Sequence, residues 1–432
     1  MAISGPAPDA TMGQPRAGQP TPVAMTMTER EDPDRRAPPA PDEPSTAHGR
    51  AAPRRAAPPR MGALLRGLVL RDRPLYVHFA VTSRCNLRCR SCVIWQRQTA
   101  DEIDLPAIAE LSRTLRRSGC VQVSLGGGEP ALRADLPEIV ATFLRAGLRT
   151  RVLTNGVAFT PELARALLDV GLREVSFSLD SLVREVQERR DGTTGSFERR
   201  IRNLVALAEM LPERGVLPLL NVVVTPGNLG ELPELVALAA DLGFWLSVIP
   251  IHLPPRRDSP DGGAPHPFYG EAPDLGFGGG GRDELRQAFA ELIRLKRRGA
   301  PVVNSTSFLR RSAEFLASGS ALWPCRAGEL FLSVGPDGMV APCHAFEDRW
   351  EVPFSKLPEA LRSRAHRQEV RERVAGCEGC FRPCWAEVSF MALEARSLLE
   401  MTRVQATARL RRRRVNSGEV LRRAGLAGET AR

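Results

Sequence analysis

Nine cysteines are distributed unevenly along this chain of 432 residues. Three lie together near residue 90 and five lie more than 200 residues later, while Cys120 stands alone at a predicted helix–strand junction. The N-terminal residues lack the charged-then-apolar pattern of a secretory signal, so we expect a cytoplasmic protein, in which disulfides are rare. The grouped cysteines therefore predict metal or redox chemistry, whereas Cys120 predicts a buried apolar position.

The first group has the spacing C-x3-C-x2-C, in the stretch Cys85-Asn-Leu-Arg-Cys89-Arg-Ser-Cys92. Three neighbouring thiolates suit a soft metal centre. A structural zinc site needs four ligands, and no fourth cysteine or histidine lies nearby in the sequence. A [4Fe–4S] cluster held by three cysteines keeps one iron open for another ligand, which is what catalysis requires. Structural zinc is the alternative that the spacing leaves open.

This spacing resembles the cluster-binding motif of the radical S-adenosylmethionine (radical SAM) superfamily, where it also follows a first strand. Ser91 departs from the motif, because the family more often has an aromatic residue at that place. The resemblance implies a [4Fe–4S] cluster on the three cysteines, with SAM bound at the open iron. It also implies that one electron cleaves SAM to methionine and a 5′-deoxyadenosyl radical, which abstracts hydrogen from a substrate C–H bond.

Other segments resemble the SAM-binding motifs of the same family. The run Gly126-Gly127-Gly128-Glu129-Pro130 resembles its GGEP motif, and glycine lets a backbone approach a ligand closely. Ser178 and Asp180 lie two residues apart in a predicted strand, so they share a face, like the family's ribose-binding pair. By resemblance Asn155 shapes the pocket and Arg190 meets the SAM carboxylate, although Asp191 stands where that arginine is expected. The expected SAM-binding residues are Gly127, Gly128, Glu129, Asn155, Ser178, Asp180 and Arg190.

Six apolar, β-branched segments alternate with six segments of helical periodicity between residues 75 and 298. The strands are expected at 75–82, 121–125, 149–153, 174–179, 217–225 and 246–252, and the helices at 105–118, 135–146, 161–170, 197–210, 231–241 and 283–298. Such alternation predicts a parallel α/β sheet, open or curved into a partial barrel, with its site at the C-terminal ends of the strands. The resemblance implies the second form, a partial (β/α)6 TIM-like barrel over residues 74–300, with an irregular loop at 253–281.

The later cysteines predict a second metal centre in a small C-terminal α+β domain at about 320–390. A Pro-Asp-Gly turn between apolar runs predicts a β-hairpin with Cys325 before it and Cys343 after it. This hairpin and the C-x2-C that follows resemble the SPASM domain and the shorter twitch domain, which hold auxiliary [4Fe–4S] clusters. One cluster is expected on four of the five cysteines, and a zinc ribbon is the alternative. The candidate ligands are Cys325, Cys343, Cys377, Cys380 and Cys384.

The layout implies an oxidative modification in which the auxiliary cluster accepts an electron or positions the substrate. A peptide and a small natural-product or cofactor precursor are both possible substrates, and a flavodoxin or ferredoxin is the expected low-potential electron donor. His252, at the end of the sixth strand, is the candidate catalytic residue on the substrate side.

Composition narrows the remaining classes of function. The chain is 43% hydrophobic and 25% charged, has no apolar run long enough to span a membrane, and carries a net charge of +10. Its basic residues are 58 arginines and only Lys296 and Lys356, a bias more easily explained by GC-rich coding than by phosphate binding.

Residues 1–60 hold 13 of the 36 prolines and are expected to be disordered, and residues 391–432 are expected to form a basic helical tail. Nucleic acid is an unlikely partner at 5% aromatic residues; the rival hypothesis is a zinc-stabilised protein that binds it through this tail.

Overall fold

The structure is a computed structural model that describes residues 67, 73–97, 101–253, 269–270, 272–278, 280–319, 323–346, 351–377 and 380–427. The chain divides into two units, residues 1–51 and residues 52–432, and all described residues belong to the second. The segment at 1–60 that is expected to be disordered, and most of the loop at 253–281, lie outside the described residues.

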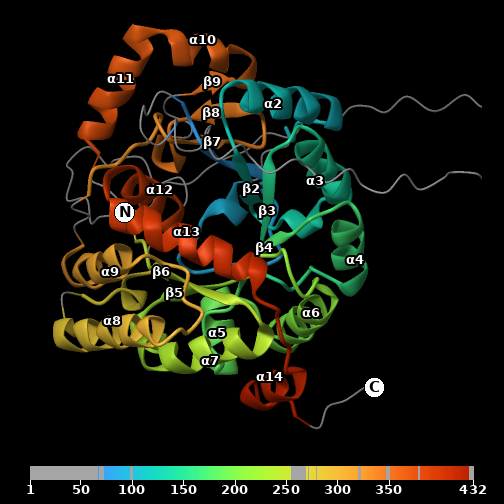
Figure 1. Ribbon diagram of the computed structural model, residues 1–432, viewed down its shortest axis with the longest axis vertical. Coiled ribbons are helices and arrows are strands. Elements are labelled where there is room, and N and C mark those ends of the chain that lie inside the picture. Colours follow the sequence, from blue (N-terminus) through green and yellow to red (C-terminus); the bar gives the residue numbers. More distant parts are fainter. Residues whose placement is uncertain are drawn as a thin grey trace, which may run out of the picture. The chain divides into compact units, whose positions relative to one another are not determined.

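Six parallel strands form the centre of the described fold, in the order in which they follow one another in the sequence (Figure 1). They are β1 (Tyr76–Thr82), β2 (Gln122–Gly127), β3 (Arg149–Thr154), β4 (Glu174–Ser178), β5 (Leu219–Val224) and β6 (Trp245–Pro250). Neighbours pair in parallel throughout, which confirms the predicted parallel α/β sheet and partial barrel. Each strand lies within about two residues of the position expected from periodicity.

Helices follow the strands, and most of them cover the outer face of the sheet (Figure 1). They are α2 (Leu105–Arg117), α3 (Leu136–Arg145), α4 (Pro161–Asp169), α5 (Arg184–Asp191), α6 (Phe197–Met210), α7 (Leu232–Leu242) and α8 (Arg282–Arg297). The starts of α2 and α4 are capped by side chains: Asp104 accepts the backbone N–H of Ala107 at 2.9 Å, and Thr160 accepts that of Leu163 at 3.3 Å. Short 3-10 turns lie at Ile94–Gln96, Pro130–Leu132, Pro226–Glu231, Pro273–Leu275, His344–Phe346 and Phe354–Lys356.

The two faces of each strand have different chemistry. On β1, Val77, Phe79 and Val81 are fully buried in the core between sheet and helices. Tyr76 and His78 alternate with them and line a cavity on the inner face. The main apolar core therefore lies between the sheet and the outer helices, and the inner face carries both polar and apolar side chains.

The later part of the chain extends the same sheet beyond β1. Strand β7 (Phe331–Val334) pairs in parallel with β1, β8 (Met339–Ala341) is antiparallel to β7, and β9 (Val352–Pro353) to β8. The β7–β8 hairpin turns at Gly338, whose φ is +81°, which confirms the hairpin predicted from Pro-Asp-Gly. The remaining helices are α9 (Thr306–Ser318), α10 (Leu357–Arg362), α11 (Arg364–Ala375), α12 (Pro383–Leu393), α13 (Ala395–Leu410) and α14 (Ser417–Arg423).

The basic C-terminal residues bind to the barrel helices through buried contacts. The Arg413 guanidinium donates to the backbone oxygens of Ala208 and Leu242, at 3.1 and 2.8 Å. Burial lowers its pKa to about 10. Arg412 pairs with Glu213 at 2.7 Å, so part of this positive charge is used within the chain. No helix of the described residues is long and apolar enough to cross a membrane.

Candidate active site

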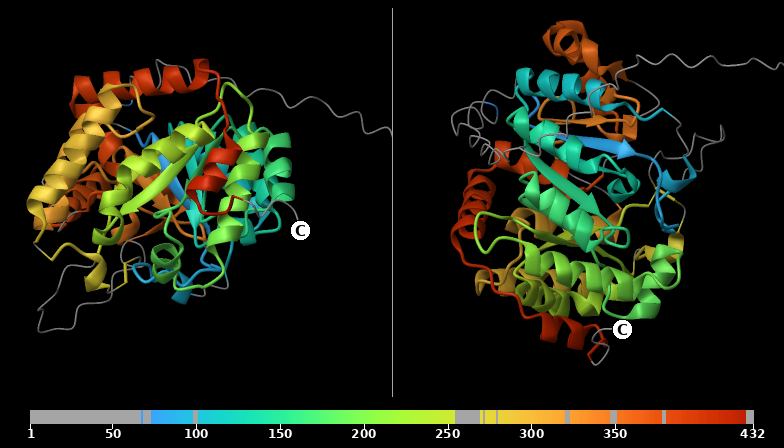
Figure 2. Two further views of the ribbon diagram at one scale, coloured as in Figure 1. Left: turned by 90° about the horizontal axis from the view of Figure 1, so that it is seen from below. Right: turned by 90° about the vertical axis from the view of Figure 1, so that its right-hand side faces the viewer.

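One cavity of about 1800 Å³ occupies the inner side of the barrel. Its walls come from the inward side chains of β1 to β6, from the first cysteine loop, and from α12 and α13. In the left view of Figure 2, α13 (red) and the first cysteine loop (blue) lie at opposite ends of the strands, and residues of both line the cavity, so it runs from one end of the strands to the other. At the C-terminal end it is lined by predicted site residues, namely Cys89, Cys92, Gly127, Asn155, Ser178, Asp180 and Arg190.

The first three cysteines lie on the loop that follows β1, held by backbone hydrogen bonds to the end of α5. The N–H groups of Arg88 and Arg90 donate to the carbonyls of Asp191 and Arg190, at 3.0 and 3.2 Å. Burial raises the pKa of all three thiols, that of Cys85 to about 11, and Cys92 raises the pKa of the other two further. Without a metal these thiols keep their protons, and binding of a soft metal centre would displace those protons.

The two cysteine groups offer soft thiolate donors, three in the first loop and five later in the chain. A structural zinc site needs four ligands, whereas a [4Fe–4S] cluster held by three cysteines keeps one iron open. The three thiols of the first loop therefore suit an iron–sulfur cluster.

The glycine turn after β2 lies against the cysteine loop. Gly127 has a φ of +109°, and a Cβ on it would lie 2.3 Å from the carbonyl oxygen of Thr82. A Cβ on Gly128 would lie 2.0 Å from the carbonyl oxygen of Arg84. Only glycine fits this approach, and the turn accordingly positions the loop that carries Cys85 as well as the backbone at the cavity wall.

Glu129 connects the ends of β2 and β3. Its buried carboxylate accepts from the Thr154 hydroxyl at 2.8 Å and from the backbone N–H groups of Asn155 and Ala131, at 2.7 and 3.0 Å. Burial raises its pKa against these hydrogen bonds. The side chain does not line the cavity; it fixes the position of Asn155. The Asn155 amide nitrogen in turn lies 3.9 Å from the Cys85 sulfur.

Asp180 and Arg190 form an ion pair at the cavity wall, with Asp180 Oδ2 3.1 Å from Arg190 Nε. The other oxygen of Asp180 accepts the backbone N–H of Val223 at 2.6 Å. Burial raises the pKa of Asp180, and Arg190 opposes that rise. Ser178 lies two residues earlier on the same face, as predicted, and also lines the cavity. Arg190 is thus at the predicted place but already engaged with Asp180.

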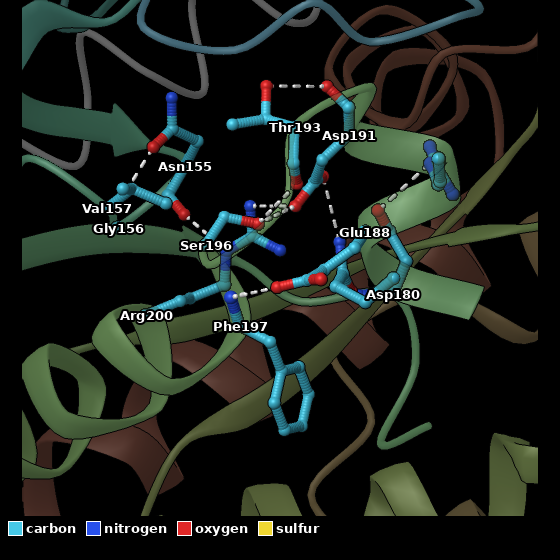
Figure 3. A network of polar contacts seen from close by, with 12 residues as sticks. Asn155, Gly156, Val157, Asp180, Glu188, Asp191, Thr193, Ser196, Phe197 and Arg200 are labelled. Atoms are coloured by element: carbon cyan, nitrogen blue, oxygen red, sulfur yellow. Dashed lines mark hydrogen bonds and ion pairs between the residues drawn. The ribbon is translucent and has the colours of Figure 1, made fainter. Parts of the chain in front are cut away.

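A second arginine, Arg200 on α6, reaches the same wall (Figure 3). Its Nη2 lies 2.7 Å from Asp191 Oδ2, and its Nε donates to the backbone oxygen of Asn155 at 2.7 Å. Its Nη1 is buried without a hydrogen-bond partner among the described residues. Sequence reasoning missed Arg200, because the strongest signal for it is indirect: Asp191 occupies an arginine's usual place and needs a buried cation nearby.

The five later cysteines lie near one another, and Cys325, Cys343, Cys380 and Cys384 pack in one cluster. Burial raises the pKa of Cys325 to about 12, and Cys380 and Cys377 raise it further. Burial also raises the pKa of Cys343, with added contributions from Cys380, Cys325 and Cys377. Cys384 also lines the barrel cavity; burial and Cys380 raise its pKa, and Arg382 opposes that rise as it does for Cys380. Cys120 is 1% exposed, as predicted for an apolar position.

Tyr269 and Arg382 connect the two cysteine groups. Tyr269 pairs with Cys92 in an isolated β-bridge, and its hydroxyl accepts from Arg382 Nε at 2.5 Å. Arg382 comes two residues after Cys380. The His252 ring stacks on Tyr269 with centroids 5.3 Å apart, and its Nε2 accepts the backbone N–H of Phe381 at 2.7 Å. His252 therefore lines the cavity and also anchors the segment after Cys380.

Comparison with known proteins places these features in a family. Residues 79–242 match the model of the radical SAM superfamily. The PqqA peptide cyclase of Ruegeria pomeroyi is 27% identical over 295 residues, which are 66% of this chain and 72% of that protein. The mycofactocin maturase MftC of Mycobacterium tuberculosis is 33% identical over 184 residues, 42% of this chain and 45% of its own.

Solved structures agree on the fold. SuiB of Streptococcus suis, bound to S-adenosylmethionine, superposes with a TM-score of 0.53 at 16% identity, over 76% of each chain. The family match runs from β1 to α7, the region that carries the first cysteine loop, the glycine turn and the Asp180 wall. The family and the enzyme class predicted from the sequence are confirmed for this region: residues 79–242 form a radical SAM domain.

Proposed function

We propose that this enzyme oxidatively modifies a precursor peptide inside the barrel. The observation that carries the proposal is the cavity, whose volume of about 1800 Å³ exceeds the roughly 300–1,000 Å³ of one small-molecule site and so has room for SAM and a sizeable substrate together. Both cysteine regions contribute to the cavity wall, the first through Cys92 and the second through Cys384. The similarity to a peptide cyclase over two thirds of the chain supports the same choice of substrate.

Cys85, Cys89 and Cys92 would hold the first [4Fe–4S] cluster, and the wall formed by Gly127, Gly128, Asn155, Ser178, Asp180, Arg190 and Arg200 would bind SAM. When bound together, cluster and SAM supply a 5′-deoxyadenosyl radical that abstracts hydrogen from an unactivated C–H bond. The Asp180 carboxylate would orient the ribose hydroxyls. The buried, unpartnered Nη1 of Arg200 suits the SAM carboxylate, because a charge-assisted hydrogen bond would satisfy it.

Cys325, Cys343, Cys377 and Cys380 would hold an auxiliary [4Fe–4S] cluster closed by four thiolates. This leaves Cys384 as a cavity thiol, which fits its place on the wall. The contact between Tyr269 and Arg382 would then hold the two cluster-binding segments in one arrangement. The rival hypothesis, a zinc-stabilised protein that binds nucleic acid, is not favoured by the family match.

The reaction would remove two hydrogen atoms from the peptide, one to the radical and one as a proton with its electron passed to the auxiliary cluster. His252 stays the candidate for a residue that acts near the substrate. A flavodoxin or ferredoxin would supply the low-potential electron. The enzyme would act in the cytoplasm, because such donors and iron–sulfur clusters need a reducing compartment.

The experiment is anaerobic reconstitution followed by reaction with SAM, dithionite and the peptide encoded by a short reading frame beside the gene. The proposal expects about eight irons per chain, formation of 5′-deoxyadenosine, and a peptide lighter by two hydrogen atoms. The matched control replaces Cys85, Cys89 and Cys92 by alanine, which should stop SAM cleavage and keep the second cluster. Unchanged peptides together with turnover of a small molecule would refute the peptide assignment.

A further inference from the structure

The end of the cavity away from the cysteine loop is rich in arginine. Where β3, β4 and β5 begin, beside the end of α13, the charged residues that line it are Glu174 and the five arginines of what we call the arginine mouth, Arg149, Arg151, Arg173, Arg214 and Arg409. Among the described lining residues at this end, one carboxylate thus faces five guanidinium groups. At the SAM end, by contrast, Arg190 and Arg200 pair with Asp180 and Asp191.

Both oxygens of the single carboxylate, that of Glu174, are already bound by arginines. Arg149 and Arg151 bind its two oxygens, the second at 2.8 Å, and Arg409 lies 3.9 Å from it. Although burial alone would raise the pKa of Glu174, these arginines hold it at about 2. Burial lowers the pKa of Arg409, and the like charge of Arg149 lowers it further. The positive charge at this end is therefore in excess.

The excess charge lies at an opening. Arg173, Arg214 and Arg409 are exposed while they line the cavity, and α13 runs across this side of the strands (Figures 1 and 2). The mouth is held in place by backbone contacts, since the N–H of Gly215 donates to the carbonyl of Arg409 at 3.1 Å. Arg149 adds a hydrogen bond to Gln405 of α13 at 3.1 Å.

We propose that the arginine mouth binds an acidic segment of the substrate peptide and so sets which residue reaches the SAM end. Guanidinium groups pair with carboxylates in a fork geometry, which suits glutamate and aspartate side chains. From Glu174 to Ser178 and Asp180 the strand rises about 13 to 20 Å at about 3.3 Å per residue. An extended peptide has the same rise per residue, so the acidic residues of the substrate should lie roughly four to six positions from its modified residue. This inference rests on the peptide function proposed above.

The test measures binding of fluorescein-labelled peptides to the reconstituted enzyme by anisotropy at physiological salt. The peptides have one length and sequence except for a run of glutamates, glutamines or lysines at one end. The glutamate peptide should bind about tenfold tighter than the glutamine peptide, as two or more exposed guanidinium contacts supply. R214E/R409E should abolish this preference and bind the lysine peptide instead. The control R403E/R411E makes the same charge change on exposed arginines outside the cavity lining and should behave as wild type.

Two outcomes would overturn the inference: equal binding of the glutamate and glutamine peptides, or an equal loss in R214E/R409E and in the control. An RNA oligonucleotide that displaces the glutamate peptide at lower concentration would also overturn it, because the mouth would then prefer phosphates. Formation of 5′-deoxyadenosine, measured on the same samples, separates this from the proposed function. An enzyme that cleaves SAM but ignores peptide charge refutes the mouth alone, and one that modifies no peptide refutes the function itself.

Discussion

The buried ion pair of Arg200 and Asp191 gives the sharpest test of the SAM wall. The two side chains are 1% and 4% exposed, with 2.7 Å between Nη2 and Oδ2. R200M removes the guanidinium and leaves the Asp191 carboxylate buried, with donors only from Ser196 and Gln187. Breaking a buried pair on one side costs about 3–5 kcal/mol of folding free energy, because one charge stays desolvated. Removing both charges, in D191N/R200M, should restore most of that loss.

The assay compares urea unfolding and SAM binding for the reconstituted wild type, the two single variants and the double variant. If Arg200 Nη1 meets the SAM carboxylate, the double variant regains stability but binds SAM about 10- to 100-fold more weakly, the value of a charge-assisted hydrogen bond. R294Q is the control, since it breaks the half-exposed pair with Glu291 on α8 and should cost less than about 1 kcal/mol.

One result would refute the buried ion pair, and another would refute the contact between Arg200 and SAM. A stability of R200M close to that of R294Q would mean that the buried pair is not where the structure places it. Full recovery of SAM affinity in D191N/R200M would mean that Arg200 supports the wall without touching the ligand, and Arg190 would then be the remaining candidate for the carboxylate.

Three further predictions concern the cysteine loop, the second cluster and the response to pH. G127A should lose the first cluster, because its Cβ would meet a backbone oxygen at 2.3 Å, whereas G195A, with φ of +71° and open space, should cost only about 1 kcal/mol and keep its iron. C377S should fall from about eight to about four irons, while C384S should keep all of them. Burial raises the pKa of Glu387 to about 7, so the folded state holds a proton that the unfolded state loses near 4.5. Stability should fall by up to about 3 kcal/mol as pH rises from 4.5 to 7, and E387Q should remove that part of the fall in urea titrations at each pH.

The strands and most barrel helices could be predicted because their local signal agrees with their tertiary place. All six parallel strands are short apolar, β-branched segments, and α2, α4 and α7 have apolar residues at helical spacing on one face. The missed helix α5 reads Arg-Glu-Val-Gln-Glu-Arg-Arg-Asp and has little apolar face. It forms because Gln187 and Asp191 make buried polar contacts, which periodicity does not reveal.

Some residues of the candidate site could be predicted from local sequence, and others could not. Spacing alone predicted the three cysteines of the first loop, because their chemistry requires them to be close in sequence. Arg200 lies 45 residues after Asn155, to which it donates, and only the fold brings the two together. The same holds for Arg413, whose burial against α6 and α7 could not be read from a run of four arginines. Contacts made across long separations depend on packing, and packing is what a single sequence states least directly.

The alternation along β1 explains how one sheet serves both stability and chemistry. Val77, Phe79 and Val81 are buried against the helices, so the free energy of apolar burial is gained on the outer face. A closed barrel fills its interior with side chains, whereas this sheet is continued at β1 by β7 and bordered by α12 and α13, which leaves the inner face hollow. Polar residues such as His78 therefore need water or a ligand inside. The fold consequently keeps a large inner cavity, with polar and apolar walls, without weakening the core that holds it.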